Sequence, residues 1–150
     1  MEKRKSGLKT NLICYYGVLQ TAHLIVLIRA GLILLFSETY PFPILPPPAG
    51  WQPQTLPFLY GLGLTDTIGI IIGIVFAYRA VIKKKVNLRS GILSLTIFIT
   101  GAVVFGAGTF PSGAWTAHPV AYWVMVGLFT PVPILYLLLL SAQINRNQHI

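Results

Sequence analysis

Acidic side chains are almost missing from this chain. Only 3 of its 150 residues are Asp or Glu, and charged residues of both signs make up 9% of it. A soluble domain carries about 25% charged residues, so the composition excludes a soluble enzyme and a secreted domain. The chain is 55% hydrophobic, with a mean hydropathy of +0.73, which is typical of a protein that lies in lipid.

Cysteines and metal-binding patterns are also scarce. Cys14 is the single cysteine, so no disulfide can form within the chain. No group of His, Cys and carboxylates has the spacing of a metal site, and no catalytic motif is present, which argues against an enzyme. His23 has no second histidine at a similar depth, which argues against a bis-histidine haem. We expect no cofactor of the chain's own, while a bound lipid or a pigment shared with other subunits is compatible with the sequence.

The basic residues follow an alternating pattern along the chain, whose formal net charge is +8. The connections at about 37–57 and 108–118 contain no Lys or Arg. Apart from Arg29, the basic residues lie before the first apolar segment, from the end of the second segment to the start of the third, and after the fourth: Lys3, Arg4, Lys5, Lys9, Arg79, Lys83, Lys84, Lys85, Arg89 and Arg146. This is the positive-inside pattern. It predicts cytoplasmic N- and C-termini, contact with membrane lipid head groups and no nucleic-acid partner.

Four apolar segments are long enough to cross a membrane, which takes about 20 residues. They cover about residues 12–36, 57–80, 91–109 and 119–142. Short connections favour antiparallel neighbours. We therefore predict an all-α fold, in which residues 1–150 form one transmembrane domain with an up-down-up-down bundle of four helices.

Prolines are concentrated in the outer loop at about 37–57, which holds seven of the eleven: Pro41, Pro43, Pro46, Pro47, Pro48, Pro53 and Pro57. Proline fixes φ and lacks an N–H, so this loop is not expected to be helical. It serves either as a lid over a pocket or as a rigid tie between helices. Pro131 and Pro133 fall within the fourth segment, where they are expected to kink the helix.

Three charged residues lie within or beside the apolar segments: Arg29, Glu38 and Asp66. Charge at membrane depth is rare and is usually paired or functional. Counted inward from the outer ends at 1.5 Å per residue, Arg29 and Asp66 lie at roughly 10 and 13 Å, so we expect an ion pair. Such a pair is either a buried clamp between helices or one side of a polar pocket. Glu38 lies about 180° from Arg29 around the helix and is expected at the rim.

Small residues recur at every fourth position of the second segment. They are Thr65, Gly69, Gly73 and Ala77, and such a ladder lets two helix backbones approach closely in lipid. We therefore predict that Gly69, Gly73 and Ala77 form a packing face, which turns the neighbouring Asp66 toward protein rather than lipid.

Short motifs around the outer loop resemble the emopamil-binding/sigma-2 receptor family of four- and five-helix sterol-handling proteins. They are the acid in Leu35-Phe36-Ser37-Glu38, then Tyr40-Pro41, then Pro47-Pro48-Ala49-Gly50-Trp51, together with Asp66 and the prolines of the fourth segment. The spacing of the loop differs, and Arg29 has no counterpart in the family pattern. The resemblance implies a pocket for a lipophilic ligand.

Two functions of different classes fit these observations. The first is a small non-catalytic accessory or assembly subunit of a larger membrane complex, with protein partners in the membrane. The absence of catalytic motifs, the glycine ladder and the small size favour it. The second is a stand-alone protein that binds or isomerises a sterol- or isoprenoid-like molecule. Its candidate ligand-binding residues are His23, Arg29, Glu38 and Asp66.

Overall fold

The computed structural model describes residues 2–37, 47–52 and 55–148, and the regular structure in these ranges is entirely helical. This architecture confirms the predicted all-α fold. The elements are α1 (Glu2–Ser37), α2 (Thr55–Val81), α3 (Leu88–Thr109), the short 3-10 helix η1 (Phe110–Ser112), α4 (Ala114–Ala117), α5 (Pro119–Phe129) and α6 (Pro131–Asn147).

Four stretches of the described chain are long and apolar enough to span a bilayer, as predicted. They are Gly7–Arg29, Pro57–Val81, Leu88–Ser112 and Pro119–Asn147. The protein is therefore a multi-pass membrane protein by length and composition, while the up-down order of its helices across the bilayer stays a prediction.

The fourth span is broken in the middle, as the two prolines predict. Helix α5 ends at Phe129 and α6 begins at Pro131. At the break, the Thr130 N–H is shared between the carbonyls of Val126 at 3.0 Å and Gly127 at 3.3 Å. Proline lacks the N–H that would continue the ladder, so the hydrogen-bond ladder is interrupted at this point although Thr130 keeps a helical φ of −53° and ψ of −37°.

The other turns also have local causes. Helix α3 begins after Asn87, whose side-chain oxygen accepts the Ser90 N–H at 3.3 Å and caps the helix. Gly113 has φ +81°, a left-handed conformation that suits glycine, and it turns the chain from η1 into α4. In the described part of the outer loop, the Gly50 N–H bonds the Pro47 carbonyl at 2.8 Å. This short turn is not helical, in agreement with the prediction.

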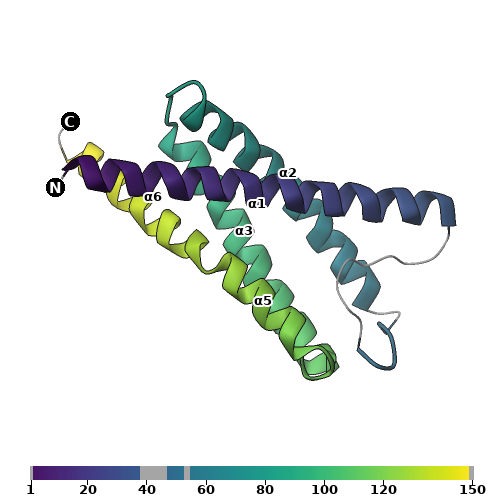
Figure 1. Ribbon diagram of the computed structural model, residues 1–150. Coiled ribbons are helices and arrows are strands. Elements are labelled where there is room, and N and C mark those ends of the chain that lie inside the picture. The colour runs from purple at the N-terminus through teal and green to yellow at the C-terminus, as the bar shows by residue number, and fades with distance from the viewer. Residues whose placement is uncertain (1, 38–46, 53–54, 149–150) are drawn as a thin grey trace.

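The helices diverge from one end of the molecule (Figure 1). The start of α1 and the end of α6 lie together, and α1 and α5 splay apart from there. Packed side chains form two separate clusters, which we name inner and outer by their distance from the two chain ends. An inner cluster joins α1, α2, α3 and α6 around Tyr16, Phe76, Leu95 and Leu139. A smaller outer cluster joins α2, α3, α4 and α5 around Leu59, Phe105, Ala114 and Tyr122.

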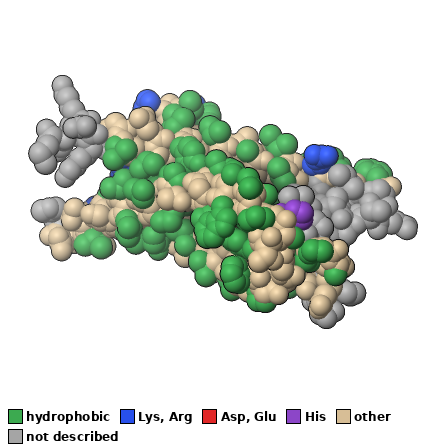
Figure 2. Space-filling model, turned by 60° about the horizontal axis from the view of Figure 1, so that its bottom comes forward, with side chains coloured by type: hydrophobic (Ala, Val, Ile, Leu, Met, Phe, Trp, Pro, Cys, Tyr) green, Lys and Arg blue, Asp and Glu red, His purple; other side chains and the backbone are tan. Residues whose placement is uncertain are grey.

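The outer surface is largely apolar (Figure 2). Hydrophobic side chains spread over the visible face, and Lys and Arg appear at only a few places on it. Exposed large hydrophobic residues occur on every long helix, such as Val18 on α1, Leu64 on α2, Val103 on α3 and Leu137 on α6. A soluble protein rarely exposes so much contiguous apolar surface, so this surface is suited to lipid.

Candidate functional site

A cavity of about 500 Å³ lies between the two clusters of packed side chains. Its lining comes from α1, α2, α3, α4, α5 and α6. Phe98 and Val132 of the inner cluster and Leu59 and Phe105 of the outer cluster contribute to its wall. The cavity therefore occupies the gap where the diverging helices stop packing against one another.

Aromatic rings line the inner end of the cavity. The Phe98 ring meets the Phe129 ring edge-on, with centroids 5.1 Å apart, and it meets the His23 ring edge-on at 6.3 Å. All three residues line the cavity. The edge-to-face arrangement is the favourable one for aromatic pairs, and it gives this end a fixed apolar surface.

Trp115 lines the opposite, outer side of the cavity. Its indole N–H donates to Thr109 Oγ1 at 3.0 Å, and its ring lies 4.7 Å from that of Tyr122 between centroids. Thr109 itself donates to the Phe105 carbonyl at 2.7 Å. The turn after α3 thus holds the Trp115 ring in place against the outer cluster.

Among the described residues, Asp66 of α2 is the acidic residue that lines this cavity. Its Oδ1 atom is buried and has no hydrogen-bond partner. The atoms nearest to a Cβ built on Gly101 of α3 all belong to the Asp66 carboxyl group, so the carboxyl group lies across α3 at that glycine. A buried polar group without a partner costs free energy. Oδ1 itself lies against α3, while the Asp66 side chain contributes to the cavity wall.

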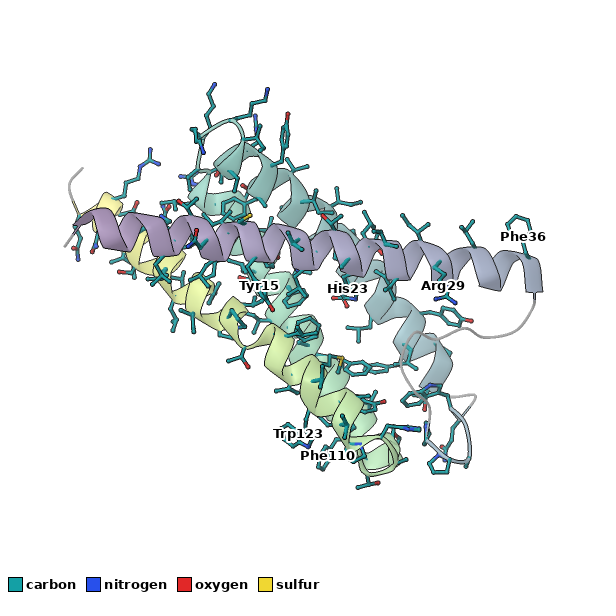
Figure 3. The ribbon with its side chains drawn as sticks, viewed as in Figure 1. Tyr15, His23, Arg29, Phe36, Phe110 and Trp123 are labelled. Carbon is teal, nitrogen blue, oxygen red and sulfur yellow. The ribbon has the colours of Figure 1, made fainter. Side chains whose placement is uncertain are left out.

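His23 of α1 lines the same cavity. Its Nδ1 atom is also buried without a hydrogen-bond partner. Figure 3 shows His23 near the middle of α1, on the side from which Tyr15 also projects. The Tyr15 hydroxyl donates to the Leu128 carbonyl at 2.6 Å, which ties this side of α1 to the end of α5. An imidazole and a carboxyl group, each with one buried atom that has no hydrogen-bond partner, therefore belong to residues that line one apolar cavity.

The predicted ion pair between Arg29 and Asp66 is absent from the described part of the chain. Asp66 Oδ1 has no hydrogen-bond partner, and the Arg29 side chain is exposed. In Figure 3 Arg29 lies beyond His23 toward the Phe36 end of α1. The prediction compared the depths of Arg29 and Asp66 along their helices, which assumes parallel helix axes. In the structure α1 crosses α2 at an angle (Figure 1). Residues equally far from the two helix ends are therefore separated in space.

The remaining predicted residues lie at helix contacts or outside the described ranges. Glu38 lies outside the described residues. Gly69 and Gly73 are buried against α3, because an added Cβ would lie 2.6 Å from Ile97 Cγ2 and from Ser94 Oγ respectively. Ala77 is buried, and its Cβ would lie 2.7 Å from a Cβ built on Gly17 of α1. The ladder therefore meets two different helices.

Gln20 is a buried polar residue that the sequence-based prediction omits. It is fully buried, and neither its amide oxygen nor its amide nitrogen has a hydrogen-bond partner. It lies four residues after Tyr16 and three before His23, a spacing that puts all three on one face of α1. This stripe of polar residues on an otherwise apolar helix could have been recognised in the sequence as a buried polar face. Gly101, Phe98 and Trp115 carry no comparable signal in the sequence.

A second hollow, of about 620 Å³, runs between α2 and α3. It is lined by Pro57, Gly61 and Thr65 on one helix and by Thr100 and Val104 on the other, among others. Leu62 and Gly101 line both this groove and the cavity. The Asp66 carboxyl group, which lies against Gly101, is therefore close to the wall that separates the two hollows.

Within the described ranges, no group of three or more His, Cys, Asp or Glu side chains is arranged to hold a metal ion. No protein-family model, curated protein sequence or solved structure matches this chain. The likeness to the emopamil-binding/sigma-2 receptor family therefore rests on the short motifs alone.

Proposed function

We propose that this protein binds a lipophilic molecule, of sterol-like or isoprenoid-like size, that carries a hydrogen-bond donor at one end. The observation that carries the proposal is the Asp66 carboxyl group, which belongs to a residue lining an apolar cavity and whose buried Oδ1 atom has no hydrogen-bond partner. A carboxyl group at membrane depth is expensive unless it is paired. A hydroxyl or amino group of a ligand supplies the missing donor, and the charge-assisted form of such a bond is the stronger one.

The size and lining of the cavity support a small-molecule ligand. Ligand pockets typically measure about 300–1,000 Å³ and combine apolar walls with a few polar groups. This cavity measures about 500 Å³ and has aromatic walls at Phe98, Phe129 and Trp115. Its polar lining residues include His23 and Asp66, each with a buried atom that has no hydrogen-bond partner. The apolar body of the ligand would lie against the rings while its donor meets the carboxyl group.

The proposal includes the predicted orientation, in which both chain termini are cytoplasmic, and the arrangement of the chain ends supports it. The start of α1, the end of α6 and the turn between α2 and α3 lie toward one side of the molecule (Figure 1). Lys83, Lys84 and Lys85 belong to that turn. The positive-inside rule assigns this basic side to the cytoplasm, and a fluorescent protein fused at the C-terminus should then mature in the cytoplasm.

Binding is tested with three probes that share one apolar body: a sterol with its hydroxyl, the corresponding amine, and the hydrocarbon that lacks both. Trp115 emission in a Trp51→Phe, Trp123→Phe background reports occupancy, because Trp115 lines the cavity. We expect the hydroxyl or amine probe to bind about tenfold or more tightly than the hydrocarbon, as one hydrogen bond to a charged group allows. Asp66→Asn should remove most of that difference.

The control is Glu2→Gln, which makes the same acid-to-amide change at the start of α1 and should leave probe binding unchanged. Equal affinity for all three probes in the wild type would contradict the proposal. Native mass spectrometry of gently extracted protein adds a second readout. A stoichiometric unrelated polypeptide without a retained lipophile would favour the accessory-subunit hypothesis instead, and conversion of a probe would identify an isomerase.

A further inference from the structure

Resting on the proposed function, we propose that Gly101 is the positioning residue that holds the Asp66 carboxyl group in place for the ligand. The contact is steric. A Cβ at position 101 would lie closer than 3.0 Å to Asp66 Oδ1, and its next neighbours are Asp66 Cγ at 3.4 Å and Asp66 Oδ2 at 3.7 Å. Asp66 Oδ1 therefore occupies the space that a Cβ at this position would fill, while Cγ and Oδ2 lie at ordinary contact distance.

Steric positioning gives the carboxyl group no hydrogen-bond donor. Gly101 lies in the middle of α3, where each backbone N–H is used by the helix itself, so α3 offers the carboxyl group no donor. Asp66 Oδ1 accordingly has no hydrogen-bond partner. A donor side chain at this contact would satisfy Asp66 and remove the group that the ligand needs. A glycine at this position contacts the carboxyl group without offering it a hydrogen-bond donor.

The place of Gly101 also sets where the polar end of the ligand lies. Gly101 lines both the cavity and the groove between α2 and α3. The carboxyl group is thus held at the α2–α3 edge of the cavity. Any side chain at position 101 would displace the carboxyl group from that edge. Gly101 therefore contributes to specificity for a ligand that presents its donor at this edge.

The test is a double-mutant cycle with Gly101→Ala and Asp66→Ala, read with the hydroxyl, amine and hydrocarbon probes and by thermal unfolding. If Gly101 acts through Asp66, Gly101→Ala lowers affinity for the hydroxyl or amine probe about tenfold and leaves the hydrocarbon unchanged. In the Asp66→Ala background the same substitution has no further effect on binding, because the two residues form one unit. The matched control is Gly106→Ala on the same helix, where an added Cβ meets nothing within 4 Å.

Each outcome of the cycle decides the question. If Gly101→Ala alone does not fold but folds in the Asp66→Ala background, the carboxyl contact is the cause and the inference stands. Unfolded protein in both backgrounds overturns it, as does wild-type affinity for the amine and hydroxyl probes in Gly101→Ala. An equal loss for all three probes overturns it too. If the wild type binds no probe, the proposed function fails and the inference fails with it.

Discussion

The Tyr16 hydroxyl lies 2.6 Å from Ser94 Oγ, and both side chains are fully buried. Ser94 Oγ donates to the Gly69 carbonyl at 2.7 Å. Because a hydroxyl has one proton, Ser94 uses its own on Gly69 and Tyr16 is the donor to Ser94. The three residues belong to α1, α3 and α2, so a chain of neutral hydrogen bonds joins three helices.

Tyr16→Phe should destabilise the protein by roughly 0.5–2 kcal/mol, the range for such bonds between membrane helices. The substitution removes one donor while the ring keeps its edge contact with Phe98, at 6.0 Å between centroids. Unfolding in mixed micelles with increasing denaturing detergent measures the change. Thr21→Val is the control, since the Thr21 hydroxyl is exposed and bonds only the Gly17 carbonyl of its own helix. Equal stability of Tyr16→Phe and the wild type would show that the bond contributes nothing.

Gly73→Ala should destabilise the protein by about 1–3 kcal/mol, the usual cost of overpacking. The new methyl group would lie 2.6 Å from Ser94 Oγ and 3.0 Å from the Tyr16 hydroxyl, so it disrupts the same hydrogen-bond chain. Gly61→Ala on the same helix meets nothing within 4 Å and should be neutral or slightly stabilising, because alanine favours helix. The same unfolding assay compares the two. A loss in Gly61→Ala as large as that in Gly73→Ala would argue against a specific contact.

Arg29→Gln should change the free energy of unfolding by less than about 0.5 kcal/mol, as is usual for an exposed side chain without a structural partner. Arg29 is exposed and forms no ion pair with Asp66 in the described part of the chain. Arg79→Gln, an exposed arginine in the last turn of α2, is the comparison. The charge swap of Arg29→Asp with Asp66→Arg should fail to restore folding. A swap that folds well, together with an unstable Arg29→Gln, would restore the ion-pair hypothesis.

Replacing Pro131 and Pro133 together by alanine should make α5 and α6 one continuous helix, because the missing N–H groups return. Val132 and Pro133 line the cavity next to the break, so probe binding should weaken. Spin labels on the native Cys14, which is exposed, and on a cysteine introduced at Val120, which is 76% exposed, report the change as a shifted distance distribution. Pro119→Ala, at the start of α5, should leave the distribution unchanged, and no shift in the double variant would contradict the prediction.

Local features of the sequence accounted for the elements themselves. Hydropathy identified the four spans, since a helix in lipid must be apolar along its whole length. Pro131 and Pro133 predicted the break in the fourth span because the missing N–H acts on the residues beside it. The same kind of reasoning marked Asp66 as a residue at which function or pairing was to be expected.

The partners of these residues were decided by tertiary structure. Depth counting placed Asp66 opposite Arg29, but it contains no information on the angle or rotation of one helix about another. Those follow from packing, where Gly69 lets Ile97 approach and Gly73 lets Ser94 approach. That packing turns Asp66 onto Gly101 and away from any cation of the described chain. The sequence alone therefore determined that a charged residue lies in an apolar span. Only the packing of α1, α2 and α3 decided that Asp66 lies against Gly101 without a hydrogen-bond partner for Oδ1 and lines an apolar cavity.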